Sequence, residues 1–159
     1  MNEIAALAER KAHLSRKLGA INRMVGHLSY SRSRLPYPIA SVNALGEAEL
    51  ESVSALVERF GKLQDLLGNV FRELLVLSGE DATDMNDVLS RLEKVSVLDS
   101  ADDWRGLRAL RNLGVHDYDD DDSGKSEFIN EMAAQSVTLD RVAERVLAYC
   151  REKLNVQSC

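Results

Sequence analysis

Apolar residues recur at intervals of three and four along much of this chain, and these intervals predict helices. In the first segment they form one seam, which is typical of a helix in an antiparallel bundle or a coiled coil. The seam consists of Ile4, Leu7, Leu14, Leu18, Ile21, Val25 and Leu28, with a break at Lys11. Because Asn2 is a good N-cap residue, the pattern predicts a helix over 2–28. Pro36 and Pro38 then predict a flexible loop over about 29–46.

The second apolar segment is wider and predicts a helix over 47–77, with Gly79 as its stop. Its apolar residues form three neighbouring stripes, so we expect this helix to lie centrally in a bundle or to pack against a second subunit as well. The stripes are Leu50, Val57 and Phe71; Val53, Phe60, Leu67 and Leu74; and Leu56, Leu63, Val70 and Leu77. Gly61 and Gly68 weaken the helix, so they are expected to permit a close helix approach or a bend.

Three further helices are predicted, over about 84–95, 100–113 and 126–154. Ser100 and Asp103 resemble a capping box at the start of the second of these, and Gly114 is expected to end or loosen it. Its inward residues are expected to be Trp104, Leu107, Leu110 and Leu113. An acidic loop is predicted over about 117–125. No strand-like alternation stands out, so the fold class is all-α: one domain over 1–159, an up-and-down bundle of four or five helices.

Composition and charge limit the possible functions. The start of the chain lacks a signal-peptide pattern, and no apolar stretch is long enough to span a membrane, so we expect a cytoplasmic protein. Cys150 and Cys159 do not form a disulfide framework; Cys150 is expected in the core and Cys159 at a frayed terminus. The net charge is −6, yet residues 1–34 carry an excess of positive charge. That first third is a phosphate-facing surface, a contact for an acidic partner, or a solvated helix face.

The histidine best placed for chemistry is His116, because His13 and His27 lie among polar positions of the first helix without ligand spacing. His116 follows Arg111 by five residues and precedes Tyr118 by two. Histidine transfers protons near neutral pH, and arginine binds phosphate oxygens with a planar fork. RNA cleavage without a metal needs both proton transfer and stabilisation of the phosphate charge. Two chains would supply two histidines and two arginines for these roles. The alternative is a salt bridge at a helix end between Arg111 and Asp117 or a neighbouring aspartate.

A family resemblance favours the catalytic interpretation. HepT-type HEPN toxins carry an Arg-x4-His-x-Tyr motif at the end of a long helix of a helical bundle. The chain matches it, including the usual Arg-Asn opening, with Arg111-Asn112-Leu113-Gly114-Val115-His116-Asp117-Tyr118. The resemblance implies a HEPN-like homodimer that is a metal-independent endoribonuclease toxin needing no cofactor. It implies a composite site at the subunit interface, with Arg111 and His116 as the catalytic pair and Asn112 orienting RNA substrate or backbone.

The same resemblance implies a second partner, a minimal nucleotidyltransferase that acts as antitoxin by adding AMP to Tyr118. A bulky anionic adduct there would block the cleft and repel RNA phosphate. Two other hypotheses remain open. In one the chain is a non-catalytic subunit that presents substrate to the nucleotidyltransferase and docks through the Arg-His-Tyr segment. In the other it is a helical interaction protein whose motif only caps a helix.

One feature departs from the family pattern, because acidic residues surround the motif at Asp117 and over 119–122. Carboxylates beside an RNA cleft oppose phosphate binding, although they would raise the pKa of His116 and favour its cationic form. We expect this acidic run to be a solvated loop or a partner contact rather than part of the catalytic machinery. Metal binding by the run is conceivable, but it lacks the glycine and glutamate placement of an EF-hand.

Overall fold

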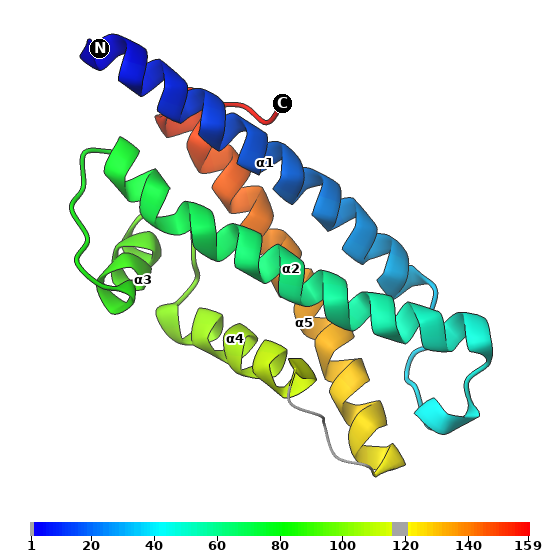
Figure 1. Cartoon of the computed structure of the whole chain (residues 1–159). Coiled ribbons are helices and arrows are strands. Elements are labelled where there is room, and N and C mark those ends of the chain that lie inside the picture. The colour runs from blue at the N-terminus through cyan, green and yellow to red at the C-terminus, as the bar shows by residue number, and fades with distance from the viewer. Residues whose placement is uncertain (1, 116–120) are drawn as a thin grey trace.

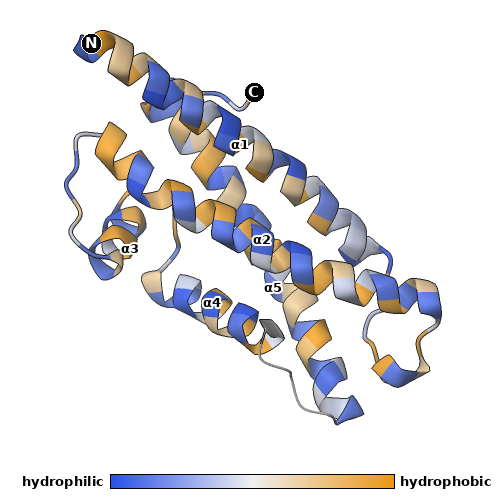
Figure 2. Ribbon diagram, in the orientation of Figure 1, coloured by the Kyte–Doolittle hydropathy of each residue, from blue (hydrophilic) through white to orange (hydrophobic). Residues whose placement is uncertain are grey.

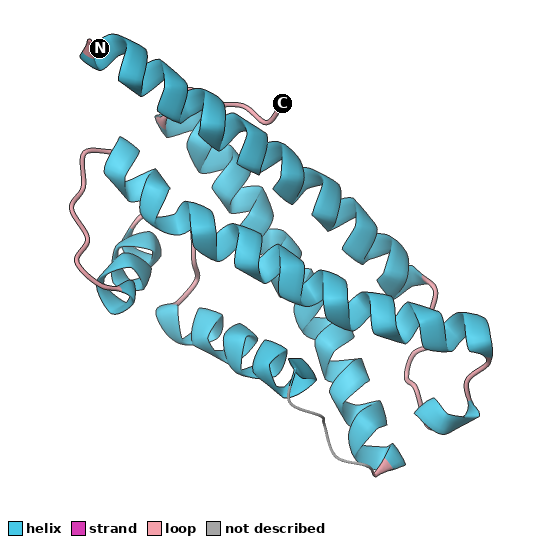
Figure 3. Cartoon of the chain, viewed as in Figure 1, coloured by secondary structure: helices cyan, strands magenta, loops and turns pink. Residues whose placement is uncertain are grey.

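The computed structural model describes residues 2–115 and 121–159, apart from the side chain of Val115. These residues form helices and loops, without a β-strand among them (Figure 3). The helices are α1 (Glu3–Ser33), the 3-10 helix η1 (Val42–Ala44), α2 (Glu47–Leu77), α3 (Met85–Lys94), α4 (Ala101–Val115) and α5 (Asp122–Lys153). Successive long helices run in alternating directions (Figure 1). The predicted all-α bundle is therefore confirmed.

Helix α2 lies at the centre of the bundle and contacts α1, α3, α4 and α5. Its wide apolar face explains this position, since a central helix needs apolar residues on more than one side. Figure 2 shows the apolar positions recurring along the whole length of α2. Its predicted bounds are correct, and Gly79 directly after its C-cap Ser78 has a positive φ of 78°. The central placement, one of the two alternatives for so wide an apolar face, is what the fold adopts.

Helix α1 is longer than predicted, ending at Ser33 rather than near residue 28. Contacts with other helices hold the extra turn. The Arg32 guanidinium donates to Ser136 Oγ at 2.8 Å and to Asp140 Oδ2 at 3.0 Å, both on α5. At the other end, the first turns of α1 project beyond the end of α2 (Figure 1). Ile4 is therefore 79% exposed, although the seam predicted it to be packed.

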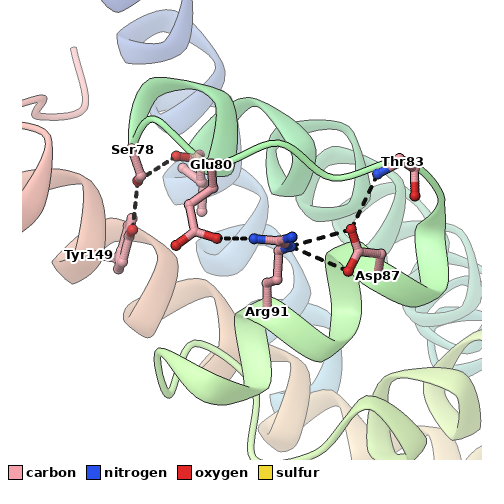
Figure 4. A network of polar contacts seen from close by, with 7 residues as sticks. Ser78, Glu80, Thr83, Asp87, Arg91 and Tyr149 are labelled. Carbon is pink, nitrogen blue, oxygen red and sulfur yellow. Dashed lines mark hydrogen bonds and ion pairs between the residues drawn. The ribbon is translucent and has the colours of Figure 1, made fainter.

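Polar contacts fix the short helix α3 and the segment before it to the bundle (Figure 4). The Arg91 side chain on α3 pairs with Glu80 of the α2–α3 connection and, at 3.3 Å, with Asp87. Ser78 at the end of α2 shares a hydrogen bond of 2.6 Å with the Tyr149 hydroxyl of α5. Because this connection is tied to both α3 and α5, the chain reaches the start of α4 from a fixed position.

The C-terminal tail lies against α1, which contradicts the expectation of a frayed terminus at Cys159. Its residues Leu154 and Val156 are buried. Ser15 Oγ donates to the Gln157 carbonyl at 2.6 Å, and the Cys159 amide donates to the Ser15 carbonyl at 3.3 Å. The tail therefore covers one side of α1.

The two cysteines are free, and they differ in exposure. Cys150 lies in the core as predicted, whereas Cys159 is exposed. Burial, and secondarily the nearby Glu73 carboxylate, raises the pKa of the Cys150 thiol to about 12. Within the described part of the chain, no helix combines the length and apolar character that crossing a membrane requires.

Candidate active site

Helix α4 carries the first half of the motif and begins as its sequence predicts. Ser100 Oγ accepts a hydrogen bond of 2.9 Å from the Asp103 amide, the capping contact expected at this position. One turn later, Trp104 is buried, and its ring centroid lies 4.6 Å from that of Phe71 on α2. Leu107 is buried as well. The first half of α4 is thus fixed to α2 by apolar packing.

The second half of α4 faces α2 with different residues from those predicted. Leu113, expected to point inward, is 55% exposed. The inward position belongs to Gly114, where an added Cβ would lie 3.1 Å from Val57 Cγ1 and 3.3 Å from Phe128 Cζ. Helix α4 continues through Gly114 to Val115, so the helix does not end at this glycine. It allows α4 to approach α2 and α5 closely.

Arg111 occupies the other inward position of this half. Its side chain packs over Gly61 of α2, where an added Cβ would lie 3.3 Å from Arg111 Nε and 3.5 Å from Cγ. Gly61 therefore makes room for the Arg111 side chain against α2. Arg111 Nη2 donates to Asp65 Oδ2 at 2.9 Å, and the Arg111 side chain remains 29% exposed. Its Nε atom is buried without a hydrogen-bond partner among the described residues.

The α2 face beneath Arg111 contains a second unpartnered polar group. Val57, Gly61, Gly68 and Phe71 of α2 all approach residues of α4. Gln64 falls midway along that stripe in the same alternation of four and three residues, so it faces α4 too. Gln64 is fully buried, and neither its Oε1 nor its Nε2 has a partner in the described structure. The seam between α2 and α4 is therefore apolar at one end and polar around Arg111.

The remaining motif residues are placed only in part. Asn112 is exposed on α4, and no hydrogen bond of its side chain is seen in the described structure. His116, Asp117 and Tyr118 lie outside the described residues, so the structure does not test whether Arg111 and His116 come together. The alternative ion pair of Arg111 with Asp117 is likewise untested, because Asp117 lies outside the described residues; the ion pair that is described joins Arg111 to Asp65, 46 residues earlier in the chain.

The end of the acidic run has a structural role that the sequence did not indicate. Asp122 begins α5 and accepts hydrogen bonds from Ser41 Oγ at 2.7 Å and from the Asn43 amide at 2.9 Å. These bonds, the one from Ser41 first, lower the pKa of the Asp122 carboxyl. Asp121 is the N-cap of α5 and accepts from the Ser123 amide. The predicted loop over 117–125 therefore ends before residue 122, while Asp119 and Asp120 lie outside the described residues.

A groove of about 520 Å³ runs between α4 and α5 beside the motif. The exposed Leu113 and the half-buried Leu110 line it on the α4 side, together with Gly106 and Ala109. Acidic residues also line it, among them Asp99, whose pKa is lowered chiefly by its hydrogen bond from Arg145. The groove therefore offers small and apolar side chains next to the end of α4.

Sequence reasoning missed Gln64 and Asp65 as neighbours of Arg111. A polar residue between apolar stripes carries no local signal of which helix it faces. His13 and His27 are exposed on α1, as predicted. The described residues include no cluster of three or more His, Cys, Asp or Glu side chains suited to a metal ion.

Comparisons of the chain with models of protein families, with curated proteins and with solved structures found no match.

Proposed function

We propose that this chain is a metal-independent endoribonuclease toxin of the HEPN type, active as a homodimer with a composite site. In this proposal the Arg111 guanidinium stabilises the extra negative charge on the pentacoordinate phosphorus. His116 of one chain removes the proton of the 2′-hydroxyl, and His116 of the other chain gives a proton to the leaving 5′-oxygen. Asn112, exposed on the same helix, orients the substrate.

The observation that carries the proposal is the way Arg111 is held. Asp65 anchors one nitrogen of the guanidinium, and Gly61 gives the stem room to lie against α2. The side chain stays partly open to solvent, so donors remain for a phosphate. Such a fixed, accessible cation is what electrostatic stabilisation of a transition state requires. An arginine that only capped a helix would not need a glycine beneath it.

A second copy of the chain is part of this proposal because one His and one Arg per site are too few. The α4 face beside the motif suits that contact. Leu113 and Leu110 present apolar surface there, and Gly106 and Ala109 keep the helix narrow enough for close approach. Apolar surface exposed next to a site is typical of an interface. A homodimer through α4 would bring two motifs to one axis.

Neutralisation by a nucleotidyltransferase that adds AMP to Tyr118 completes the proposal and rests on the motif alone. The adduct would introduce a phosphate between the two chains and repel RNA. Co-expression with a minimal nucleotidyltransferase that neutralises the chain should add the mass of AMP to the peptide containing Tyr118. Tyr118→Phe should remove both the adduct and the neutralisation. An unmodified Tyr118 in a neutralised complex would refute this part.

Cleavage of total RNA in EDTA tests the enzyme itself. The wild-type dimer should cleave, whereas Arg111→Ala and His116→Ala should not. Arg108→Ala, an exposed arginine on the same helix, and His13→Ala, an exposed histidine on α1, are the matched controls and should cleave normally. Mixing the wild type with an excess of the His116→Ala chain should suppress cleavage, because each mixed dimer then holds only one histidine in its site.

The alternative is a non-catalytic subunit that docks a nucleotidyltransferase through the same segment. It is favoured by the ion pair that already engages Arg111. In that case no variant changes the RNA, and expression of the chain alone does not arrest growth. Arg111→Ala would instead weaken binding of the nucleotidyltransferase. These outcomes would exclude the toxin and retain the docking role.

A further inference from the structure

The charge of this chain is unevenly distributed around one helix. Between residues 10 and 46 the sequence contains seven Lys and Arg residues and no Asp or Glu, although the whole chain has a net charge of −6. Most of this segment is α1. The excess positive charge is therefore concentrated on one element rather than spread over the bundle.

Two of these basic residues form ion pairs with carboxylates of neighbouring helices. Lys17 pairs with Glu73 of α2 at 3.0 Å, and Arg32 pairs with Asp140 of α5 at 3.0 Å. Arg16, Arg23 and Arg34 are exposed, and none of them forms an ion pair with a carboxylate in the described structure. The bundle thus supplies partners for the inward cations and leaves the outward ones available.

The unpaired arginines lie in one row with aromatic side chains. Arg16, Arg23, His27, Tyr30 and Arg34 are spaced by seven, four, three and four residues, which places them on one face of the helix and its C-cap. All five are exposed, and the Arg34 guanidinium lies 5.9 Å from the centre of the Tyr30 ring. At a rise of about 1.5 Å per residue, the row is about 27 Å long. We call these five residues the α1 stripe.

The composition of the α1 stripe fits a nucleic acid better than a protein. A protein interface normally has an apolar centre, but no exposed aliphatic residue lies within the stripe, where the large exposed apolar side chain is Tyr30, at 62%. Arginines grip phosphates with two parallel donors, and an exposed ring beside them can stack on a base. A positive track with an aromatic platform is typical of proteins that bind single strands without sequence preference.

We propose that the α1 stripe binds the backbone of single-stranded RNA. It is separate from the candidate active site, because α1 and α4 lie on opposite sides of α2 (Figure 1). The C-terminal tail meets α1 at Ser15 and, through Cys159, at Gly19 beside the Arg23 side chain, and the five residues of the stripe remain exposed. The stripe is thus an RNA-binding surface that does not depend on Arg111 or His116.

Fluorescence anisotropy with a labelled oligouridylate of about 16 nucleotides tests this proposal, since sites of single-strand binders reach about that size. All variants are made in the His116→Ala background, so that cleavage cannot deplete the probe. Arg23→Glu/Arg34→Glu should weaken binding by at least about tenfold at low salt. It should also make the slope of log affinity against log salt less negative by about 1.4, because two phosphate contacts are lost. Lys94→Glu/Arg108→Glu makes the same charge change on α3 and α4 and should leave both values near those of the parent.

A stacking contribution is tested at Tyr30. Tyr30→Ala should weaken oligouridylate binding several-fold, whereas Tyr30→Phe should retain it. Circular dichroism of each variant verifies that the helices are intact. Equal affinity of the two charge-reversed proteins would overturn the proposal. Polyglutamate that displaces the oligonucleotide at equal charge would also overturn it and identify the stripe as a site for an acidic protein. Neither result depends on whether the chain cleaves RNA.

Discussion

Replacing Gly61 by alanine should separate the stability of the protein from the position of Arg111. In a helix interior, alanine is favoured over glycine by about 0.8–1.0 kcal/mol. Gly26 on α1 is the matched control, because a Cβ there would meet no other atom within 4 Å. Gly26→Ala should therefore stabilise the protein by about 1 kcal/mol. For a chain of this size, that corresponds to a rise in Tm of about 2–4 °C.

At Gly61 the same gain is opposed by a tight contact. The new Cβ would lie 3.3 Å from Arg111 Nε, below the ordinary carbon contact distance of about 3.5–4.0 Å. Arg111 cannot move freely, since its Nε is buried and its Nη2 is bound to Asp65. Displacing the side chain from its rotamer costs about 0.5–1.5 kcal/mol. We therefore expect Gly61→Ala to leave the free energy of unfolding within about 0.5 kcal/mol of wild type.

Urea denaturation measures the stability, and cleavage of RNA in EDTA measures the position of Arg111. A guanidinium displaced from the phosphate should reduce cleavage by roughly tenfold in Gly61→Ala, because small misplacements of catalytic groups are costly. Gly26→Ala should cleave at the wild-type rate. If Gly61→Ala gains as much stability as Gly26→Ala and cleaves normally, Arg111 is not held over Gly61 in the way described.

Four further predictions concern the packing around this seam and the core. Gly114→Ala should destabilise the protein by about 1 kcal/mol in urea, because its Cβ would press on Val57 and Phe128 and overpacking exceeds the helix gain; an unchanged midpoint would show that the two side chains yield. Gln64→Met should stabilise by about 1–3 kcal/mol, since it removes two buried polar atoms without partners, and a loss of stability would mean that the amide has a partner. Cys150 should resist a thiol reagent at neutral pH while Cys159 reacts, and two reactive thiols in the native protein would contradict the burial of Cys150. Because folding raises the Cys150 pKa from 9.0 to about 12, its contribution to stability is complete below pH 9.0 and is lost as the pH rises toward 12, which urea titrations across that range would measure.

The sequence predicted elements well where local signals and packing agree. The bounds of α2 are correct because its apolar stripes begin and end with the helix and Gly79 stops it. The predicted end of α1 was wrong because Arg32 holds the last turn through Ser136 and Asp140 of α5. These partners lie 104 and 108 residues away in the sequence. The start of α5 was wrong for the same reason, since Asp122 bonds to residues 41 and 43. No local pattern reveals partners so distant in the chain.

For the candidate site, the sequence identified Arg111 but not its surroundings. Leu113 was expected to point inward because it is apolar, yet Arg111 and Gly114 occupy the inward positions. A hydrophobic pattern identifies an inward face by its apolar residues. It therefore cannot identify the inward face here, which an arginine and a glycine occupy because of how the helices pack. The pairing with Asp65 and the burial of Gln64 depend on how α2 and α4 align, which only the folded chain determines.

The uneven seam between α2 and α4 also bears on how the protein opens. Trp104 anchors the beginning of α4 in apolar surroundings and Gly114 packs against Val57 and Phe128 at its end. The turn between them buries the Arg111 Nε and faces Gln64, and these polar atoms lack partners that water would supply. Lifting the second half of α4 breaks the contacts of Gly114 but hydrates three buried polar atoms. Amide hydrogens in the second half of α4 should therefore exchange with solvent through a local opening. Those of the central α2 should exchange only on global unfolding. The helix that carries Arg111 would then be among the first parts of the native protein to detach.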